Sequence, residues 1–340
     1  MTAPWEEQED QELAATIKKA KRRILLRYLV IIAVSLAASL IVIFAILLGV
    51  FKLTSHESNK RSADEWWYIS ISKPNEYVSG HKDQSGFLAG VLELDTYKIV
   101  EGVPIPWNEY WSNYQVTNFP NFSGTYGGTG GLTVTDPQMK EQGYEYYRQY
   151  NIFNGQRELA FFVPGVNYNG KLLNDLPALK QMESGKLVEM ALSFDKDYSF
   201  AEVKAMLPAG VRPVWYWVDT YDDRTNFHFK PYKDGNGKLD YPIPFWPSFG
   251  VYGFGIRPDY DKAEPGDFIQ KLKGGLQPKG KYYSEYERIY NYLKKDKAEP
   301  DAGDIRLLGV VVTGTAKGLQ SLNGQPYVRA AVLGAVVDRY

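Results

Sequence analysis

The stretch that decides the fold is YLVIIAVSLAASLIVIFAILLGVF, residues 28–51. It carries no charged side chain, and its polar groups are Ser35, Ser39 and the hydroxyl of Tyr28. Because a helix rises about 1.5 Å per residue, a run of this length crosses a hydrocarbon layer about 30 Å thick. We therefore predict a transmembrane helix over 24–52, with a short tail before it and most of the chain after it.

The basic residues around this run predict its orientation. They gather just before it, at Lys18, Lys19, Lys21, Arg22, Arg23 and Arg27, whereas residues 52–60 are far less basic. Lys and Arg stay preferentially in the cytoplasm during insertion. We expect a cytoplasmic tail, 1–23, and an extracytoplasmic part that begins at about residue 53. The chain is then a single-pass protein of the cell membrane.

The length of the apolar run separates three kinds of N-terminal segment. The core of a cleaved signal peptide spans about 7–15 residues, and this run is longer, which favours an uncleaved signal anchor. A buried core helix fits poorly with a run this long and this uniform. We expect the lipid bilayer to be a partner of the chain.

Composition limits the remaining function classes. The 340 residues have a formal net charge of -1, which argues against a nucleic-acid partner, because a basic face would be expected there. Cysteine is absent, and this excludes thiol catalysis, disulfides and cysteine-bound metals. About 290 residues follow the transmembrane segment, which is enough for one large or two ordinary domains.

The tail has a helical pattern of its own. Acidic residues precede the basic block, and Leu13, Ile17 and Ala20 recur at helical spacing. We predict a short helix that continues into the membrane span. Its role is either a topology signal or a docking peptide for a cytoplasmic partner, with candidate contacts Trp5, Leu13 and Ile17.

The region 66–170 has a β-rich pattern after a polar linker, 53–65. Apolar and polar residues alternate over Trp67–Ser72, which predicts a strand that ends at Lys73-Pro74-Asn75. We expect a strand pair over 87–100 and loop over 101–131. The Asn154-Gly155 turn predicts a hairpin, whose strands would be 144–153 and 157–163.

The region 171–340 predicts an α+β domain. A short helix follows Asn174-Asp175 and runs to about Glu183. Two segments read as β-α-β units, the first with a capping box at Ser199 and the second with a helix capped by Thr315; they are 187–219 and 305–337. They suggest a four-stranded sheet with helices on one face, a ferredoxin-like split β-α-β arrangement. Its long insertion, 220–304, holds helices near 265–275 and 282–296.

Within the insertion, residues 241–256 are rich in aromatic side chains and proline. Aromatic residues make up 15% of the chain, with 26 Tyr and 8 Trp, and either an aromatic core or a binding surface accounts for them. We nominate a candidate extracytoplasmic binding surface on this segment, made of Phe245, Trp246, Phe249 and Tyr252.

Catalytic and metal-binding patterns are weak. No histidine has a second one at metal-ligand spacing, and His228 reads as a strand residue; the others are His56 and His81. The glycine-rich stretch 127–131 lacks the Lys-Ser/Thr of a phosphate-binding loop. The stretch 234–240 resembles a calcium loop, but Lys238 takes a ligand position and Phe245 stands where the closing Glu is needed, so we interpret it as a turn.

Two further nucleophile and acid–base patterns are also thin. Ser248 lacks a G-x-S-x-G context. Asp219, Asp222 and Asp223 follow a strand, where solvated turn carboxylates are common. We expect no catalytic residue, no cofactor and no metal site. A cell-envelope enzyme would depend on Asp219 with Asp223.

Three segments resemble a known family. LVEMALSFDKDYSFAEVKAMLPAGVRPVWYWVDTY (187–221) and LGVVVTGTAKGLQSLNGQPYVRAAVLGAVVD (308–338) resemble the C-terminal domain of the membrane-bound sigma factor regulators of low-GC Gram-positive bacteria. The anchor with WWYISISKPNEYVSG (66–80) resembles the N-terminal region of the same family. The resemblance covers most of residues 20 to 340.

This resemblance implies an anti-sigma factor, which holds an extracytoplasmic-function sigma factor at the membrane and releases it on an envelope signal. Only about 27 residues precede the span, and a standard interface buries about 800 Å² on each partner, so most of one helix face would be needed. The chain then acts on sigma directly or with another membrane subunit. The alternative is an extracytoplasmic binding or sensor module without sigma contact.

Overall fold

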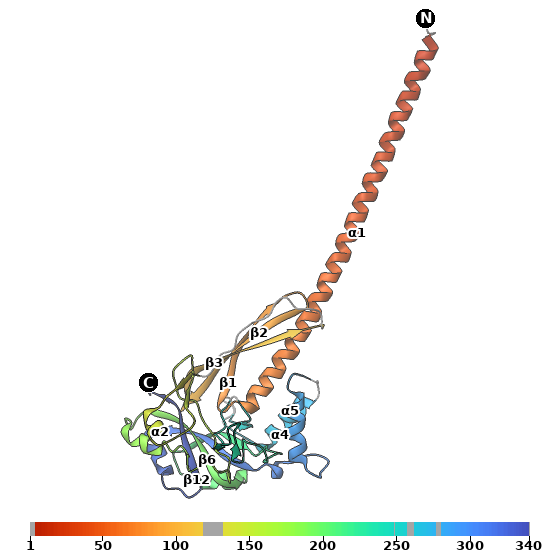
Figure 1. Ribbon diagram of the computed structural model, residues 1–340. Helices are drawn as coiled ribbons and strands as arrows, with labels where there is room; N and C mark the ends of the chain where they lie inside the picture. Colours follow the sequence, from red (N-terminus) through yellow and green to blue (C-terminus); the bar gives the residue numbers. More distant parts are fainter. Residues whose placement is uncertain (1–3, 118–131, 248, 257–261, 277–279, 340) are drawn as a thin grey trace.

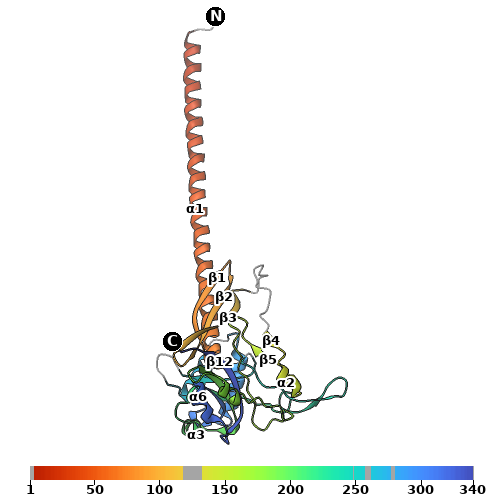
Figure 2. The same cartoon turned by 90° about the vertical axis from the view of Figure 1, so that its left-hand side faces the viewer.

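A computed structural model describes residues 4–117, 132–247, 249–256, 262–276 and 280–339, without the side chains of 4–11 and Gln138. Its first element, α1 (Pro4–Ser72), is a single helix of 69 residues. At about 1.5 Å per residue it is about 100 Å long. Its first part projects from a folded body that the second part of α1 forms with the other described residues (Figures 1 and 2).

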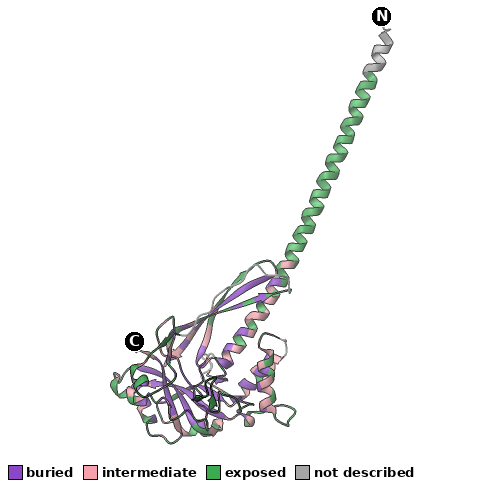
Figure 3. Ribbon diagram, in the orientation of Figure 1, coloured by how far each residue is buried: buried purple, intermediate pink, exposed green. Residues whose placement is uncertain are grey.

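The first part of α1 is the candidate membrane span. Every residue from 12 to 49 is exposed, as the continuous green of Figure 3 shows. Among the helices in the described part of the chain, α1 alone is long and apolar enough to cross a membrane. The predicted apolar helix at the N-terminus is confirmed, as is its continuity with a helical tail.

The second part of α1 corrects two predictions. Residues 53–65 are not a linker and residues 67–72 are not a strand, because both belong to α1. Ile71 is buried on another side of the helix, whereas the main buried face holds positions three to seven apart: Thr54, Ser58, Glu65, Ile69 and Ser72. That face is mostly polar, so it gives no helical hydrophobic periodicity. The helix ends at Ser72, where the strand was expected to end, because Pro74 disfavours helical backbone at the preceding residue.

Three strands form an antiparallel sheet alongside the second part of α1. They lie in the order β1 (Glu76–Ser85), β2 (Ala89–Val100) and β3 (Val103–Gln115). The expected strand pair within 87–100 is therefore one strand, β2, and its partners lie on either side of it. The predicted loop over 101–131 is wrong in its first part, which is β3. The glycine-rich stretch 127–131 lies outside the described residues.

The predicted hairpin over 144–163 is only partly correct. The turn is present, since the Asn151 N–H donates to the Gln156 carbonyl and Gly155 has a φ of 68°. The long strands are absent in this described segment: β5 (Arg148–Tyr150) pairs with β4 (Leu132–Val134), next to a short helix, α2 (Pro137–Glu141). Residues 159–163 are fully buried in the core instead of pairing along a strand.

The C-terminal body is built on a five-stranded sheet whose neighbouring strands are all antiparallel, in the order β10-β7-β11-β6-β12. The two predicted β-α-β units interleave, so that β11 lies between β6 and β7. Four strands were expected, and the insertion supplies the fifth. Their bounds are β6 (Leu187–Tyr198), β7 (Arg212–Val218), β10 (Gly253–Gly255), β11 (Leu307–Thr315) and β12 (Val328–Val337).

The helices predicted within 187–340 are present. The capping box at Ser199 starts α3 (Phe200–Met206), and the Thr315 hydroxyl accepts from the Gly318 N–H to start α6 (Ala316–Leu319). The insertion contains α4 (Pro265–Leu276) and α5 (Tyr283–Lys294). The remaining short elements are η1 (Leu176–Gln181), η2 (Ala302–Asp304), η3 (Gln320–Leu322), β8 (Tyr232–Lys233) and β9 (Leu239–Asp240).

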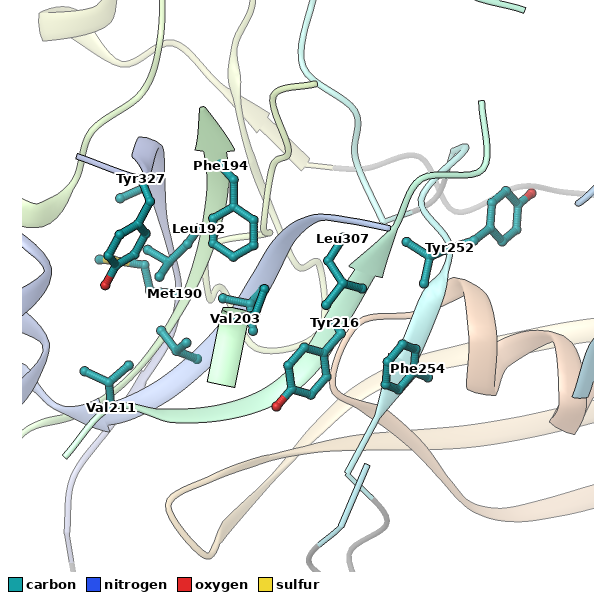
Figure 4. Packing of buried hydrophobic residues seen from close by; sticks show 14 of the residues in the cluster. Met190, Leu192, Phe194, Val203, Val211, Tyr216, Tyr252, Phe254, Leu307 and Tyr327 are labelled. Carbon is teal, nitrogen blue, oxygen red and sulfur yellow. The ribbon is translucent and has the colours of Figure 1, made fainter. Parts of the chain in front are cut away.

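The five-stranded sheet buries both faces. On one face, side chains of alternate strand residues pack with α3, α4, α5 and α6, and Figure 4 shows Met190, Leu192, Phe194 and Tyr216 in this cluster with Val203 of α3. On the other face, irregular segments pack through aromatic residues onto Trp215 and Trp217. Burial on two faces explains why the sequence of these strands is nearly continuous in apolar residues.

Candidate functional site

The second part of α1 is held between the three-stranded sheet and helices α4 and α5 (Figures 1 and 3). Glu65 is the central contact, and its carboxylate is buried. It accepts hydrogen bonds from the Ser112 hydroxyl (2.5 Å), the Tyr282 hydroxyl (2.7 Å) and the Lys281 ammonium (3.0 Å). Because these donors come from β3 and from the segment before α5, one side chain joins α1 to both of its neighbours.

A cluster of tyrosines continues this contact one turn further along α1. Tyr68 stacks on Tyr282 with ring centroids 3.6 Å apart, and its edge meets Tyr286. Its hydroxyl lies 3.2 Å from the hydroxyl of Tyr252. Burial raises the pKa of Tyr68 and of Tyr282, so both phenols stay neutral near pH 7. The cluster therefore packs as an apolar contact with polar tips.

Closer to the span, one carboxylate fastens the sheet to the helix. The Ser58 hydroxyl of α1 donates to Asp83 Oδ2 of β1 at 2.6 Å. The Tyr114 hydroxyl of β3 donates to the other oxygen of the same carboxylate, also at 2.6 Å. Hydrogen bonds to a charged acceptor are short and strong, so this level of the helix has a fixed rotation relative to the sheet.

The end of α1 rests on a fully buried ion pair. The Lys98 ammonium of β2 lies 2.9 Å from Glu189 Oε2 of β6, and it also sits 4.1 Å from the centre of the Trp107 ring. Glu189 Oε1 accepts from Asn75 Nδ2 at 2.9 Å, just after the helix. Glu189 Oε2 accepts from the Ala335 N–H of β12. The end of α1, the three-stranded sheet and the five-stranded sheet thus meet at one carboxylate.

Two more charged groups in this region, Lys73 and Glu158, are half-buried. The Lys73 ammonium donates to the Pro247 carbonyl at 3.3 Å and faces the Tyr110 ring, and burial lowers its pKa. Burial raises the pKa of Glu158, an effect that the positive charge of Lys98 opposes. Shifts of this kind mark sites where charge is held at a free-energy cost, and such sites are often functional.

A pocket of about 630 Å³ opens beside these groups, between the end of α1, β1, β2 and the edge of the five-stranded sheet. Its walls are mainly apolar, and its charged lining residues are Lys73, Lys271 and Glu76, so positive charge is in excess; the aromatic residues are Trp66, Trp67, Tyr77, Tyr97 and Trp215. Two lining residues, Asn75 and Trp215, each bury a polar atom that has no hydrogen-bond partner in the described part of the chain. This combination suits an apolar ligand with an anionic or hydrogen-bonding group.

The predicted aromatic surface on 241–256 is corrected by the structure. Phe245, Trp246 and Tyr252 are buried, so they do not form an exposed surface, whereas Phe249 is 56% exposed. The segment passes around the edge of the five-stranded sheet, and it therefore supplies side chains to both faces. Phe245 packs with the aromatic cluster, and Tyr252 packs with the helices.

The tail residues nominated from the sequence remain a prediction. Leu13 is 59% exposed and Ile17 is 46% exposed, on a part of α1 with no protein neighbour in the described residues. The side chain of Trp5 lies outside the described residues.

The residues considered for chemistry are occupied by local contacts. The Asp219 carboxylate pairs with Arg224 at 2.6 Å, and the Asp223 carboxylate accepts from Thr225. Asp234 accepts from two backbone N–H groups of its own turn, as the interpretation of 234–240 as a turn requires. Within the described residues, no group of three His, Asp or Glu side chains is placed to hold a metal ion. Ser248 lies outside the described residues.

The histidines do not come together. His56 lies on α1 and His81 on β1, and both are exposed. His228 lies in a turn, not in the strand that the sequence suggested. It packs against Phe245 and Phe249, and burial lowers its pKa.

Sequence reasoning missed the residues that hold α1. Glu65 looked like part of a linker, although its partners Ser112 and Tyr282 are 47 and 217 residues away. A clearer signal was available at Glu189, because a carboxylate inside the apolar run LVEMALSF must find a buried partner. The identity of that partner, Lys98, could not be read from the sequence.

Comparison with known proteins agrees with this organisation. Residues 14–105 match the family model described as sigma factor regulator N-terminal, and residues 179–335 match the one described as sigma factor regulator C-terminal. Among curated proteins and solved structures, no match was found. The first match covers α1 with β1 and β2, and the second covers the five-stranded sheet. The family is regulatory in character. The chain therefore belongs to the sigma factor regulator family, whose two domains indicate an anti-sigma regulator.

Proposed function

We propose that this chain couples an envelope signal to an extracytoplasmic-function sigma factor across the membrane of a Gram-positive bacterium. In this proposal the tail, 1–23, is cytoplasmic and the body, from about 53 to 340, is extracytoplasmic. The basic residues before the span support this orientation. The family membership supports the sigma factor as partner.

The continuity of α1 is the observation that carries the proposal. The helix has no proline between Pro4 and Pro74, and it runs unbroken from the tail to the buried contacts at Glu65 and Tyr68. A helix is stiff over this length, so a shift or rotation of its gripped end is carried to the tail. The pocket beside Trp66 and Trp67 lies where a bound ligand would push on that end.

The tail is the part proposed to contact the sigma factor. Leu13 and Ile17 lie on one helical face, and Trp5 precedes them. A helix this short reaches a standard interface only if most of one face takes part. A second membrane subunit that shares the contact is therefore compatible with the proposal.

Retention of sigma factors by the full chain in membranes tests this proposal. A double change, Leu13→Glu with Ile17→Glu, should abolish retention because it puts two charges on the contact face. Ala15→Glu is the matched control, since residue 15 lies on the opposite side of the helix and should keep retention. Equal retention by both variants would overturn the assigned face, and no retention by the unchanged chain would overturn direct binding.

The second candidate is a sensor module without sigma contact. The observation that favours it is the pocket, which is complete without the tail. Deletion of residues 1–17 leaves the basic residues 18–27 in place to orient the span. An unchanged regulatory phenotype after this deletion would favour the sensor, and loss of the phenotype would favour the first proposal.

We also propose how the chain divides. The interleaved order β7-β11-β6-β12 supports a ferredoxin-like arrangement for the C-terminal domain, 171–340. The preceding region, 66–170, shares α1 with the body, so it acts as the connection between span and sheet. Limited proteolysis tests this division, because cleavage at the exposed residues within 140–145 should separate the parts before it enters the five-stranded sheet.

A further inference from the structure

The turn between β1 and β2 has two large apolar residues at its central positions, where turns usually have small or polar residues. The Gly86 N–H donates to the Ala89 carbonyl at 2.7 Å, which makes Phe87 and Leu88 the two central residues. Leu88 has a φ of 55°, a conformation that favours Gly, Asn or Asp at this position. Phe87 is 71% exposed, so packing does not explain it either. Residue types that disfavour the local backbone conformation, with no packing that compensates for them, are expected at functional sites.

The height of this turn along α1 follows from the Ser58–Asp83 hydrogen bond. Four residues separate Asp83 from Phe87, and a strand rises about 3.3 Å per residue, so the turn lies about 13 Å nearer to the span. The same distance corresponds to about nine residues of helix at 1.5 Å each. Phe87 therefore lies level with about residues 49–51, the last residues of the apolar run.

The burial pattern of α1 agrees with this level. Residues 12–49 are all exposed, Val50 is the first half-buried residue and Thr54 is buried. In Figures 1 and 2 the strands lie along α1, and the folded body begins where the upper ends of the strands reach the helix. The turn is thus the part of this sheet that comes nearest to the span.

The end of the hairpin is also uncharged. Residues 84–91, QSGFLAGV, contain no ionisable side chain, and residues 114–117 at the adjoining end of β3 contain no Asp, Glu, Lys or Arg. The nearest carboxylate, Asp83, is already paired with Ser58 and Tyr114. An uncharged end that presents Phe and Leu can enter the lipid interface without desolvating a charge.

We propose that the Phe87–Leu88 turn is a second membrane contact, which enters the lipid interface at the C-terminal end of the span. The occupant is the bilayer itself, because the turn lies at the level where the apolar run ends. This inference rests on the membrane span of the proposed function. Two points of contact would fix the tilt of the body relative to the membrane.

Site-specific labelling of the full chain in phospholipid nanodiscs tests the inference, and the absence of cysteine makes single labels straightforward. A polarity-sensitive fluorophore is attached at Phe87→Cys. Phe227→Cys, an exposed phenylalanine on the loop after β7, is the matched control, and Ile41→Cys reports on the span. A quencher carried on the lipid should quench the labels at 87 and 41 several-fold more than the label at 227.

The outcomes separate the turn from the span. If the label at 41 is quenched and the label at 87 is quenched no more than that at 227, the turn does not touch lipid and the inference is wrong. If the label at 41 also escapes quenching, the span fails and the inference fails with it.

A second variant tests whether Phe87 itself holds the contact. With the label moved to Gln84→Cys, the added change Phe87→Asn should keep the turn and reduce quenching. Asn is favoured in turns, but its polar side chain does not insert into the lipid interface. Unchanged quenching would show that Phe87 does not hold the turn in the interface. Thermal unfolding of the same variant should stay near that of the parent chain, since an exposed side chain loses little packing.

Discussion

The two halves of α1 share one backbone and have opposite surroundings. Residues 12–49 contain the most apolar run in the chain and are exposed, whereas residues 54–72 are largely polar and are partly buried in the body. Figure 3 shows the change from green to purple along the helix. Apolarity in a helix therefore does not identify the half that packs against protein, because a lipid-facing half is exposed in the isolated chain.

The kind of contact differs as well as its extent. Contacts between lipid and an apolar helix have no preferred direction, so they would not fix the rotation of the candidate span. The second half is held by hydrogen bonds from Ser58 and Glu65, which have fixed directions. A helix that is fixed to the body at one end and surrounded by lipid at the other is suited, in the proposed function, to carry a movement of the body to the tail.

Among the changes to the part of the body that holds α1, removal of Lys98 should reduce the unfolding free energy the most. Lys98→Ala leaves the buried Glu189 carboxylate without its partner, and such a loss costs about 3–5 kcal/mol of unfolding free energy. Urea unfolding of the solubilised full chain measures it. Lys98→Met with Glu189→Leu should recover much of the loss, because no charge is then left buried. A single variant as stable as the parent chain would show that the end of α1 does not depend on this pair.

Two glycine substitutions compare the halves directly. A Cβ at Gly274 of α4 would meet the Trp67 ring of α1, so Gly274→Ala should destabilise the body by about 1–3 kcal/mol. A Cβ at Gly49 meets no atom within 4 Å, so Gly49→Ala should leave the body unchanged. Thermal unfolding followed by tryptophan fluorescence measures both. Equal effects of the two changes on thermal unfolding would mean that α1 does not pack tightly against α4 at Trp67.

A pH series on Glu158 tests how far this half-buried carboxylate is desolvated in the body. Burial raises the folded-state pKa of Glu158 above its ordinary value of 4.5, so the folded chain loses stability relative to the unfolded chain as the pH rises from 4.5 through that pKa. Glu158→Gln removes this loss. The variant should have the higher Tm at pH 7, and the difference should close below pH 4.5. A difference that does not change with pH would contradict a dry environment at this carboxylate.

The elements with strong local signals could be predicted from the sequence. The capping box at Ser199 and the Thr315 cap placed two helices, and alternation in 187–194 placed β6. In the N-terminal region the same rules failed, because Trp67, Ile69 and Ile71 alternate on what is a helix. Two of these side chains are buried by different neighbours, one by the three-stranded sheet and one by the helices over the five-stranded sheet.

The candidate site could not be predicted from local sequence patterns either. The buried partners of Glu65 and Glu189 lie on other elements, up to 217 residues away, and no local sequence pattern predicts them. The aromatic segment 241–256 was identified as important, but its burial followed from the edge of the sheet that it crosses.

The sequence by itself determined the lipid-compatible run, the basic residues that precede it, the two β-α-β units and the family. Each of these depends on neighbouring residues or on a repeat along the chain, so it can be read without knowing the fold. The tertiary structure alone decided that polar residues 53–72 extend the helix, and that it ends over a buried ion pair. Those features depend on hydrogen bonds between distant residues, which exist only when the chain has folded.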